Sequence, residues 1–429
     1  MKKVALSLAS VLAAATFAQE ASAIPSFARQ TGMACSSCHQ QHYPVLNGFG
    51  QAFKAAGYTM MGAQEKVEGE HLSIPAVLNG SFLLKARYQK DNKPGVVEKS
   101  GMSPSTGEWQ IPDEFSLFFG GRVADTDTMK IGFMFEGNTA ATALVAGFKM
   151  PIVIDTGAVK LMAIPYLTDA LGSSYGFEQA STGAVRGVRW AEHRKEISAQ
   201  QYVGTDGAAT GLAFVALHEM GYINVSRWSP NFTAGGAAGK TPFDAAAAHS
   251  GAVALTSTYV RAAVTPNIAD WALHIGLQSW SGLSDVGGTD FATKATAVDF
   301  QGHGNVAGME TGVYATYAKV PAVTTGDLNL FSLANDASGG LNAAGATDKT
   351  AMTIGADVSV IPHVLHIGAA YRNAKNASNK SDNAITGMVV YDLTQNVALH
   401  VNHSMYSGDA NPSATAKTQL TTFLLEAAW

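Results

Sequence analysis

The chain has 429 residues and a formal net charge of −5, so its charge gives no indication of a nucleic-acid partner. Charged residues make up only 14% of the chain, against about 25% in typical soluble domains, and 44 residues are glycine. Beyond the N-terminal segment, no apolar run approaches the roughly 20 residues that a membrane-spanning helix needs. The composition favours a transmembrane β-barrel; the alternative is a secreted, β-rich soluble protein.

Residues 1–23 have the pattern of a secretory signal peptide. Lys2 and Lys3 precede an apolar run over 4–17, and Ala21-Ser22-Ala23 matches the small-residue pattern of a cleavage site. The apolar run is too short to span a membrane as a helix. We therefore expect export to the bacterial periplasm, with a mature chain that begins near Ile24.

The stretch Cys35-Ser36-Ser37-Cys38-His39 is a C-x-x-C-H motif, which predicts a covalently attached c-type haem. In such a site the two thiols bond to the porphyrin edge and the histidine becomes the proximal ligand of the iron. The alternatives are a dithiol redox centre and half of a zinc site. The first wants a βαβ context, and the second wants more ligands than the 2 cysteines of this chain supply. We expect one covalently bound haem c, held by Cys35 and Cys38, with His39 on its iron.

Residues 24–75 predict a small α-helical c-type cytochrome module whose core the haem completes. The apolar side chains Leu46, Phe49, Phe53 and Tyr58 are spaced to lie against that haem. We expect the module in or at the periplasmic mouth of the barrel, where it would plug the lumen, as plugs do in larger barrels.

The sequence leaves the distal ligand of the haem iron open. Met60 or Met61 is favoured, because both follow Gly57, which permits a chain reversal, and a Met/His pair occurs in cytochromes c. His42 is a weaker candidate, since it lies three residues after His39 and would share its side of a helix. Met33, His71 and an open coordination position are the remaining alternatives.

The stretches 24–39, 46–50 and 53–59 resemble the fused monohaem cytochrome–porins of iron-oxidising bacteria. The resemblance is specific over these N-terminal stretches and elsewhere rests on architecture and size. It implies an outer-membrane iron oxidase, an oxidoreductase in which extracellular ferrous iron gives one electron to the haem. The haem then passes the electron to a periplasmic carrier, a cytochrome.

Residues 76–429 predict an all-β, porin-like barrel in the outer membrane. Apolar and mainly polar side chains alternate over 78–89, 115–123 and 129–136, and the turn 124–127 makes a hairpin of the last two segments. Similar segments follow at 144–150, 271–278, 354–361, 364–371, 385–391 and 397–405. Because bacterial barrels have even strand numbers, we expect about 16 antiparallel strands, with 14 or 18 as alternatives.

The segment 418–429 resembles the terminal strand of outer-membrane barrels, because it ends in an aromatic residue, Trp429. Four tryptophans, at positions 109, 190, 228 and 280, suit interfacial girdles. Longer polar or small-residue stretches are expected to be extracellular loops; these are 88–112, 168–182, 229–250 and 334–349.

No catalytic group beyond the haem is expected, because common hydrolase, metalloprotease and phosphate-loop motifs are missing from the sequence. The pairs Glu192-His193 and His218-Glu219 are candidate iron contacts, but ordinary loop or lumen roles are favoured for both. Three functions stay open: an iron oxidase, an electron conduit for another donor or acceptor, and a passive porin whose haem is structural.

Overall fold

The computed structural model describes residues 25–41, 44–62, 64–70, 72–94, 105–138, 145–180, 183–188, 190–231, 253–286, 289–322, 328–333 and 347–429. The predicted signal peptide, residues 1–23, and two distal-ligand candidates, His42 and His71, lie outside the described residues. In the part of the chain that the structure describes, no helix is both long and apolar enough to cross a membrane.

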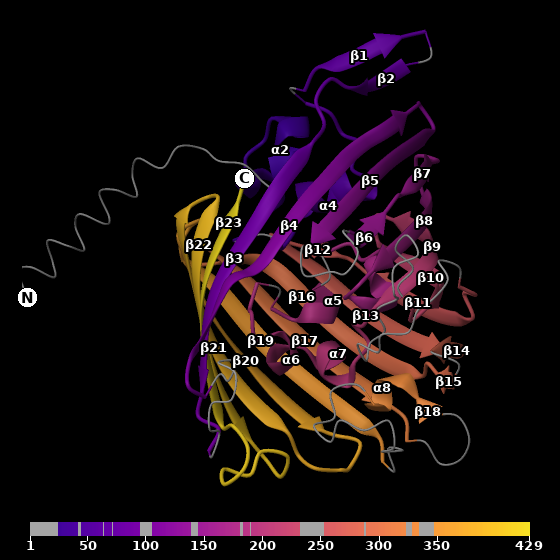
Figure 1. Ribbon diagram of the computed structural model, residues 1–429. Coiled ribbons are helices and arrows are strands. Elements are labelled where there is room, and N and C mark those ends of the chain that lie inside the picture. The colour runs from indigo at the N-terminus through magenta and orange to yellow at the C-terminus, as the bar shows by residue number, and fades with distance from the viewer. Residues whose placement is uncertain are drawn as a thin grey trace, which may run out of the picture.

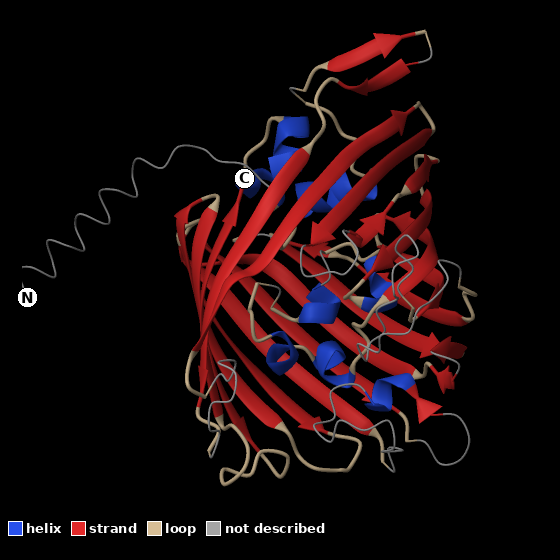
Figure 2. Cartoon of the chain, viewed as in Figure 1, coloured by secondary structure: helices blue, strands red, loops and turns tan. Residues whose placement is uncertain are grey.

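A closed antiparallel barrel forms most of the molecule (Figure 1, Figure 2). Its segments are β3 (Gly80–Asp91), β4 (Glu108–Asp125), β5 (Met129–Asn138), β6 (Val145–Lys149), β7 (Ile152–Asp155), β8 (Lys160–Thr168), β9 (Ala209–His218), β10 (Gly221–Ser229), β11 (Ser257–Val264), β12 (Asn267–Ile268), β13 (Trp271–Ser281), β16 (Ala295–Val306), β17 (Met309–Val320), β19 (Lys349–Ile361), β20 (Leu365–Lys375), β21 (Asn383–Thr394), β22 (Val397–Ser407) and β23 (Gln419–Ala428). The barrel closes where β23 pairs with β3.

These segments make 16 strands over the described residues. Segments β6 and β7 are two halves of one strand, because both pair with β5 on one side and β8 on the other. Segments β11 and β12 are likewise one strand along β13. The predicted antiparallel barrel and its strand number are confirmed.

The barrel carries its apolar side chains outward and many polar ones inward. In β13, Ile275 and Leu277 are 44% and 62% exposed, whereas His274 and Gln278, which flank them in the strand, are buried. Strand β23, which closes the barrel, has the same pattern of apolar side chains outside and polar ones inside: Phe423 is 50% exposed and Thr422 is buried. An apolar outer face on a closed sheet is what a strand-built membrane protein needs, because every backbone group is paired and the side chains meet lipid. The predicted outer-membrane location is therefore confirmed.

The hairpin predicted from the alternating pattern is present. The turn expected at 124–127 joins β4 to β5, and the C-terminal segment forms β23. Trp429 is 48% exposed and its ring stacks on Phe82 at a centroid distance of 5.5 Å. This contact fastens the end of the chain to the first barrel strand.

The two ends of the barrel differ in the length of their connections. Short turns join β4 to β5, β9 to β10 and β16 to β17 at one end, and the long connections lie at the other. Short turns mark the periplasmic side of bacterial barrels. The C-terminus and the N-terminal helices lie at this same end (Figure 1).

The N-terminal helices are α2 (Pro25–Thr31), α3 (Cys35–Cys38) and α4 (Gly48–Ala55), and they occupy the periplasmic mouth. The hydroxyl of Ser26 lies 2.8 Å from that of Ser81 in β3. Across the mouth, the Gln40 amide donates to the carbonyl of Gly304 in β16 over 3.2 Å, and the Gln41 backbone N–H donates to the Glu310 carboxylate over 2.8 Å. We call residues 25–62 the module. Its contacts reach separate arcs of the barrel wall.

The two-stranded hairpin β1 (Lys66–Gly69) and β2 (Leu72–Pro75) follows the module and projects from the same end (Figure 1). Arg122 of β4 holds it by donating to the Ser73 carbonyl over 3.3 Å. The domain boundary predicted at residue 76 falls between this hairpin and β3.

The connection between β8 and β9, residues 169–208, folds into the barrel. We call it the inner segment. Its helices are η1 (Gly172–Tyr175), α5 (Gly183–Arg186), α6 (Arg194–Ile197) and α7 (Ala199–Val203). The prediction that 168–182 is an extracellular loop is wrong for its described residues, because Tyr175 and Phe177 are 4% and 2% exposed and belong to the apolar cluster inside the barrel. Further along the segment, Val185, Ile197 and Val203 are each 0% exposed. Helix α7 contacts β17 and β19 on the inner wall.

Three of the four tryptophans assigned to interfacial girdles lie inside the barrel, which corrects that prediction. Trp190, Trp228 and Trp280 are at most 4% exposed, whereas Trp109 is 69% exposed. The indole N–H of Trp280 donates to Ser173 of the inner segment over 2.9 Å, so this residue anchors the segment to the wall. Part of the lumen is thus a packed aromatic core rather than a polar channel.

The other predicted loops are only partly described. Strand β3 extends to Asp91 and β4 begins at Glu108, so both strands run into the loop predicted at 88–112. Most of 229–250 and 334–349 lies outside the described residues. Near the extracellular end are a small sheet and a short helix: β14 (Leu283–Val286), β15 (Thr289–Ala292), β18 (Leu328–Asn329) and α8 (Leu330–Leu333).

Candidate functional site

The Cys-x-x-Cys-His motif forms one tight helical turn. Cys35 and Cys38 begin and end α3, and the backbone N–H of His39 donates to the Cys35 carbonyl over 2.9 Å. Helix α4 packs directly on this turn, because a Cβ built on Gly50 would overlap the carbonyl oxygen of Cys38. Glycine at position 50 therefore allows the close approach of the two helices.

Asn47 links the motif to α4, a role that the sequence reading did not assign. Its side-chain oxygen accepts from the backbone N–H of Gly50 over 3.0 Å, which caps the helix. Its side-chain amide donates to the carbonyls of Ser36 and Ser37 over 3.2 and 3.1 Å. The sequence contains a signal for this role, since an asparagine directly before a helical run is a typical N-cap.

His39 is buried and oriented. Its Nδ1 lies 3.1 Å from the carbonyl oxygen of Val45, and the residue is 8% exposed. The neutral tautomer with its proton on Nδ1 donates to that carbonyl and leaves the lone pair on Nε2. A backbone carbonyl that fixes the second ring nitrogen is a common arrangement for a histidine that binds a metal.

The thiols are held in their protonated form by the folded environment. Burial raises the pKa of Cys35 to about 12, and the nearby Asp392 carboxylate adds to the effect. Burial likewise raises the pKa of Cys38. A thiol rather than a thiolate is a poor metal ligand and a poor disulfide-exchange nucleophile. The described residues contain no group of three or more His, Cys, Asp or Glu side chains close enough to hold a metal ion.

A cavity of about 420 Å³ lies beside Cys38 and His39, between the module, the barrel wall and the inner segment. Its aromatic and apolar lining includes Phe27, Leu46, Phe53, Tyr58, Phe118, Met134, Tyr175 and Trp190. The rings of Phe27 and Tyr58 stack at 5.2 Å, and Phe53 packs edge-on to Phe27 at 5.1 Å. The volume is within the usual range for ligand pockets, roughly 300–1,000 Å³. The cavity can accept a large, flat, mostly apolar group attached to the motif.

Cationic side chains also reach this cavity. Lys85, Lys149, Arg186 and Arg194 belong to its lining. Lys149 donates to the Tyr175 carbonyl over 3.3 Å and lies 4.4 Å from the centre of the Tyr175 ring. The lining also includes five carboxylates, from Glu114, Glu136, Asp169, Glu192 and Glu426, so its charge is mixed. Together with Cys38 it offers a thiol, a preoriented imidazole and an aromatic box, which suit a haem attached to the motif.

The predicted haem contacts fall in different places. Leu46, Phe53 and Tyr58 line the cavity, while Phe49 is 37% exposed and is not part of the lining. Met60 and Met61 are not among the described residues that line it either. The carbonyl of Met60 accepts from the Gln30 side chain over 2.8 Å, which keeps that stretch beside α2.

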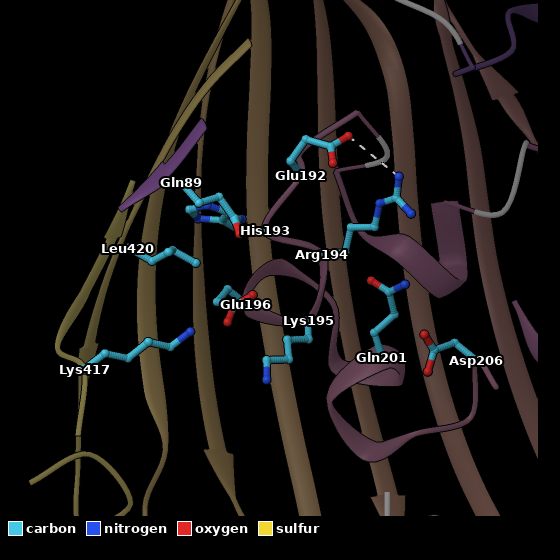
Figure 3. Close-up of a pocket in the computed structure, with 10 residues that line it drawn as sticks. All are labelled: Gln89, Glu192, His193, Arg194, Lys195, Glu196, Gln201, Asp206, Lys417 and Leu420. Atoms are coloured by element: carbon cyan, nitrogen blue, oxygen red, sulfur yellow. Dashed lines mark ion pairs between the residues drawn. The ribbon is translucent and has the colours of Figure 1, made fainter. Parts of the chain in front are cut away.

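A second cavity of about 420 Å³ lies between the inner segment and the barrel wall (Figure 3). Its lining is polar and mixed in charge: Gln89, Glu192, His193, Arg194, Lys195, Glu196, Gln201, Asp206, Lys417 and Leu420. Glu192 and Arg194 line both cavities, so the two side chains form a shared wall between them.

Glu192 is the centre of a buried charge cluster. Its carboxylate lies 2.7 Å from Arg87, 3.5 Å from Lys85 and 3.7 Å from Arg194. Burial alone would raise the pKa of Glu192, but the Lys85, Arg194 and Arg87 cations together hold it well below its usual range. This carboxylate is therefore ionised, and its three neighbouring cations offset its charge.

The four residues proposed as iron contacts are separated by the fold. The His193 ring nitrogens lie 2.6 Å from the Ser404 hydroxyl and 2.7 Å from the Thr422 hydroxyl, so wall residues hold the ring. His218 ends β9 at a periplasmic turn and accepts from the backbone N–H of Met220. The structure does not bring Glu192-His193 together with His218-Glu219.

Of three comparisons with known proteins, only the one with solved structures found similar chains. No family model matches the chain, and no curated protein matches it. Solved structures that resemble it include the anion-selective porin from Comamonas acidovorans, with a TM-score of 0.48 and 15% identity over 82% of this chain and 99% of that one. The outer membrane channel DcaP of Acinetobacter baumannii gives a TM-score of 0.48 and 11% identity over 82% and 97% of the two chains. OmpT of Vibrio cholerae gives a TM-score of 0.46 and 11% identity over 85% and 100%.

These likenesses are too distant to carry function, and the description of the fold rests on the geometry of this chain itself. That geometry is a porin-like outer-membrane barrel of 16 strands with a short helical N-terminal region in its mouth.

Proposed function

We propose that this protein is an outer-membrane c-type cytochrome built into its own barrel, which moves electrons between the cell exterior and the periplasm. The observation that carries the proposal is the position of Cys38 and His39. Both line a large aromatic cavity in the periplasmic mouth, and His39 is oriented through Nδ1. No other group on the described chain combines this motif with a cavity of suitable size.

The residues around the cavity have distinct tasks in this proposal. The thiols of Cys35 and Cys38 would hold the porphyrin edge, and His39 would bind the iron through Nε2. Phe27, Phe53 and Tyr58 exclude water from the ring, and Lys149 and Arg186 provide positive charge for the haem carboxylates. When bound, haem c supplies a one-electron couple.

Ferrous iron is the proposed electron donor, and a periplasmic cytochrome is the proposed acceptor. The donor assignment rests on the resemblance of residues 24–59 to cytochrome–porins of iron-oxidising bacteria. A one-electron donor matches a single haem, and ferric iron is poorly soluble near neutral pH, so oxidation outside the cell avoids its deposition within. The module lies at the short-turn end, where a periplasmic acceptor could approach it.

A passive channel is the second candidate, and the closed 16-strand barrel is the feature that favours it. The lumen argues against free passage of large solutes, because the module, the inner segment and an aromatic core occupy it. In this alternative the haem would be structural and the barrel would conduct small solutes around the plug.

Reduction of the haem by ferrous iron separates these functions. Purified, oxidised full-length protein should show the reduced-haem spectrum soon after ferrous iron is added at neutral pH. The Cys38→Ala and His39→Ala variants should lose the covalent haem or its normal spectrum while the barrel still inserts into membranes. A haem that a generic reductant reduces but ferrous iron does not would reject iron as the donor. Rapid liposome swelling with sugars would support the channel instead.

A further inference from the structure

We infer that His400 of strand β22 is the distal ligand of the haem iron, so that the barrel wall completes the coordination that the module begins. The inference rests on the proposed function, because it requires a haem on Cys35, Cys38 and His39. The sequence favoured Met60 or Met61 as the distal ligand, whereas the inference assigns that role to a residue far away in the sequence.

The lining of the cavity restricts the choice of ligand. Besides His39, the described residues in that lining offer one further imidazole, His400, and one thioether, Met134. A second iron ligand would have to come from an element other than the turn that carries His39. In this cavity those elements are the barrel wall and the inner segment.

His400 lies on the part of the wall that packs against the His39 side of the module. The Val45 carbonyl orients His39, and the Val45 side chain belongs to the same buried apolar cluster as Ala398. Ala398 and His400 are two residues apart in β22, so both point into the lumen. One short chain of contacts thus connects the proximal histidine to the strand that carries His400.

The surroundings of His400 are those of a positioned metal ligand. It is 2% exposed, and its Nε2 lies 3.4 Å from the carboxylate of Glu426 on the adjacent strand β23. Glu426 in turn lies 3.5 Å from Lys85. A histidine that binds a metal through one ring nitrogen commonly pairs the other with a carboxylate, which sets its orientation and raises its basicity.

Met134 is less well placed. It lies on β5 and packs against the apolar cluster that contains Ala55 and Val153, on the other side of the module. Among the described residues, this cluster is separate from the one that contains Val45, whose carbonyl orients His39. We therefore do not assign Met134 as the distal ligand, and the test below includes a variant of it.

The absorption spectrum of the haem-loaded, full-length protein tests the inference. The wild-type haem should be low-spin and six-coordinate, without the Met–iron charge-transfer band. The His400→Ala variant should become high-spin, bind carbon monoxide readily when reduced, and return to low-spin when imidazole is added. The His400→Met variant should gain the Met–iron band and a higher reduction potential.

His403→Ala is the matched control, because His403 lies on the same strand but on its outward-facing side, and its spectrum should equal that of the wild type. A His400→Ala variant that stays low-spin overturns the inference, as does a wild-type Met–iron band that Met60→Leu, Met61→Leu or Met134→Leu removes. A high-spin wild type overturns it too. A wild-type chain that carries no covalent haem after expression with haem-attachment machinery would instead reject the proposed function itself.

Discussion

Gly57 of the module and Gly132 of strand β5 meet backbone to backbone, because a Cβ built on Gly132 would overlap the carbonyl oxygen of Gly57. Gly57 has a φ of +68°, which places it in the left-handed region that glycine adopts without strain. The module therefore turns at the point where it contacts the wall, and two glycines make that contact possible.

Replacing Gly132 with valine is expected to push the module away from the wall. The added side chain has backbone rather than a flexible side-chain tip in its way, so overpacking should cost about 1–3 kcal/mol. Cleavage of the module by a protease added from the periplasmic side should become faster, while the barrel still inserts. Gly387→Val in β21 is the control, because nothing lies within 4 Å of its Cβ position. Equal cleavage rates for the two variants would contradict the contact.

Lys85 holds three carboxylates together inside the barrel. Its amine lies 3.0 Å from Glu114 and 3.5 Å from both Glu192 and Glu426, and its side chain is 6% exposed. The Lys85→Met variant leaves this buried negative charge without its central cation, which should cost about 3–5 kcal/mol.

The temperature at which the barrel loses its compact electrophoretic form measures that cost. Lys66→Met is the control, because Lys66 pairs with Glu68 on the exposed hairpin at 3.5 Å, and such pairs contribute at most about 1 kcal/mol. Equal shifts of the transition temperature in the two variants would show that Lys85 does not stabilise the buried carboxylates more than Lys66 stabilises the hairpin.

The barrel could be predicted because its signal repeats in many strands, although the sequence analysis identified no strand over 151–270 or 279–353. Each strand needs an apolar outer face, so alternation over segments such as 129–136 and 397–405 carries the information locally, and the structure places β5 and β22 there. The C-x-x-C-H motif is equally local, because both thiols and the histidine belong to a single turn, α3 and the residue after it.

The contents of the lumen could not be predicted in this way. The inner segment has no periodic pattern, and its apolar residues Val185 and Ile197 are isolated among small and polar neighbours. Its position depends on partners far along the chain, such as Trp280, whose indole binds Ser173. The same limit applies to His400, which reaches the cavity of His39 only because the barrel closes.

The module should act as the periplasmic plug of the lumen. Deleting residues 25–62 while retaining the export signal removes contacts to β3, β5 and β16, and the periplasmic mouth should open. Single-channel conductance in planar bilayers is expected to rise several-fold. The double variant Cys35→Ala/Cys38→Ala is the comparison, because it keeps the chain of the module but loses the covalent haem, and so shows how much of the change in conductance comes from the haem alone. Unchanged conductance on deletion would show that the inner segment alone sets the resistance.

Protonation of His193 should destabilise the protein in acid. Burial is the main reason that the pKa of His193 falls from 6.5 to about 4 in the folded protein. Above pH 6.5 the ring is neutral in both the folded and the unfolded chain, so it contributes no pH dependence. As the pH falls from 6.5 towards 4, the unfolded chain takes up the proton first, and folding stability declines by up to about 3 kcal/mol.

The His193→Gln variant isolates this contribution, because glutamine can still bond to the wall hydroxyls but does not titrate in this range. Between pH 7.5 and 4.5, the unfolding midpoint of the variant should fall less than that of the wild type. Asp206 of the same inner segment titrates in the opposite sense, since burial raises its pKa to about 6 and its neutral form is favoured in the folded protein. Both proteins contain Asp206, so its contribution to the pH dependence of stability cancels in the comparison. Parallel curves of unfolding midpoint against pH would show that the His193 ring does not resist protonation.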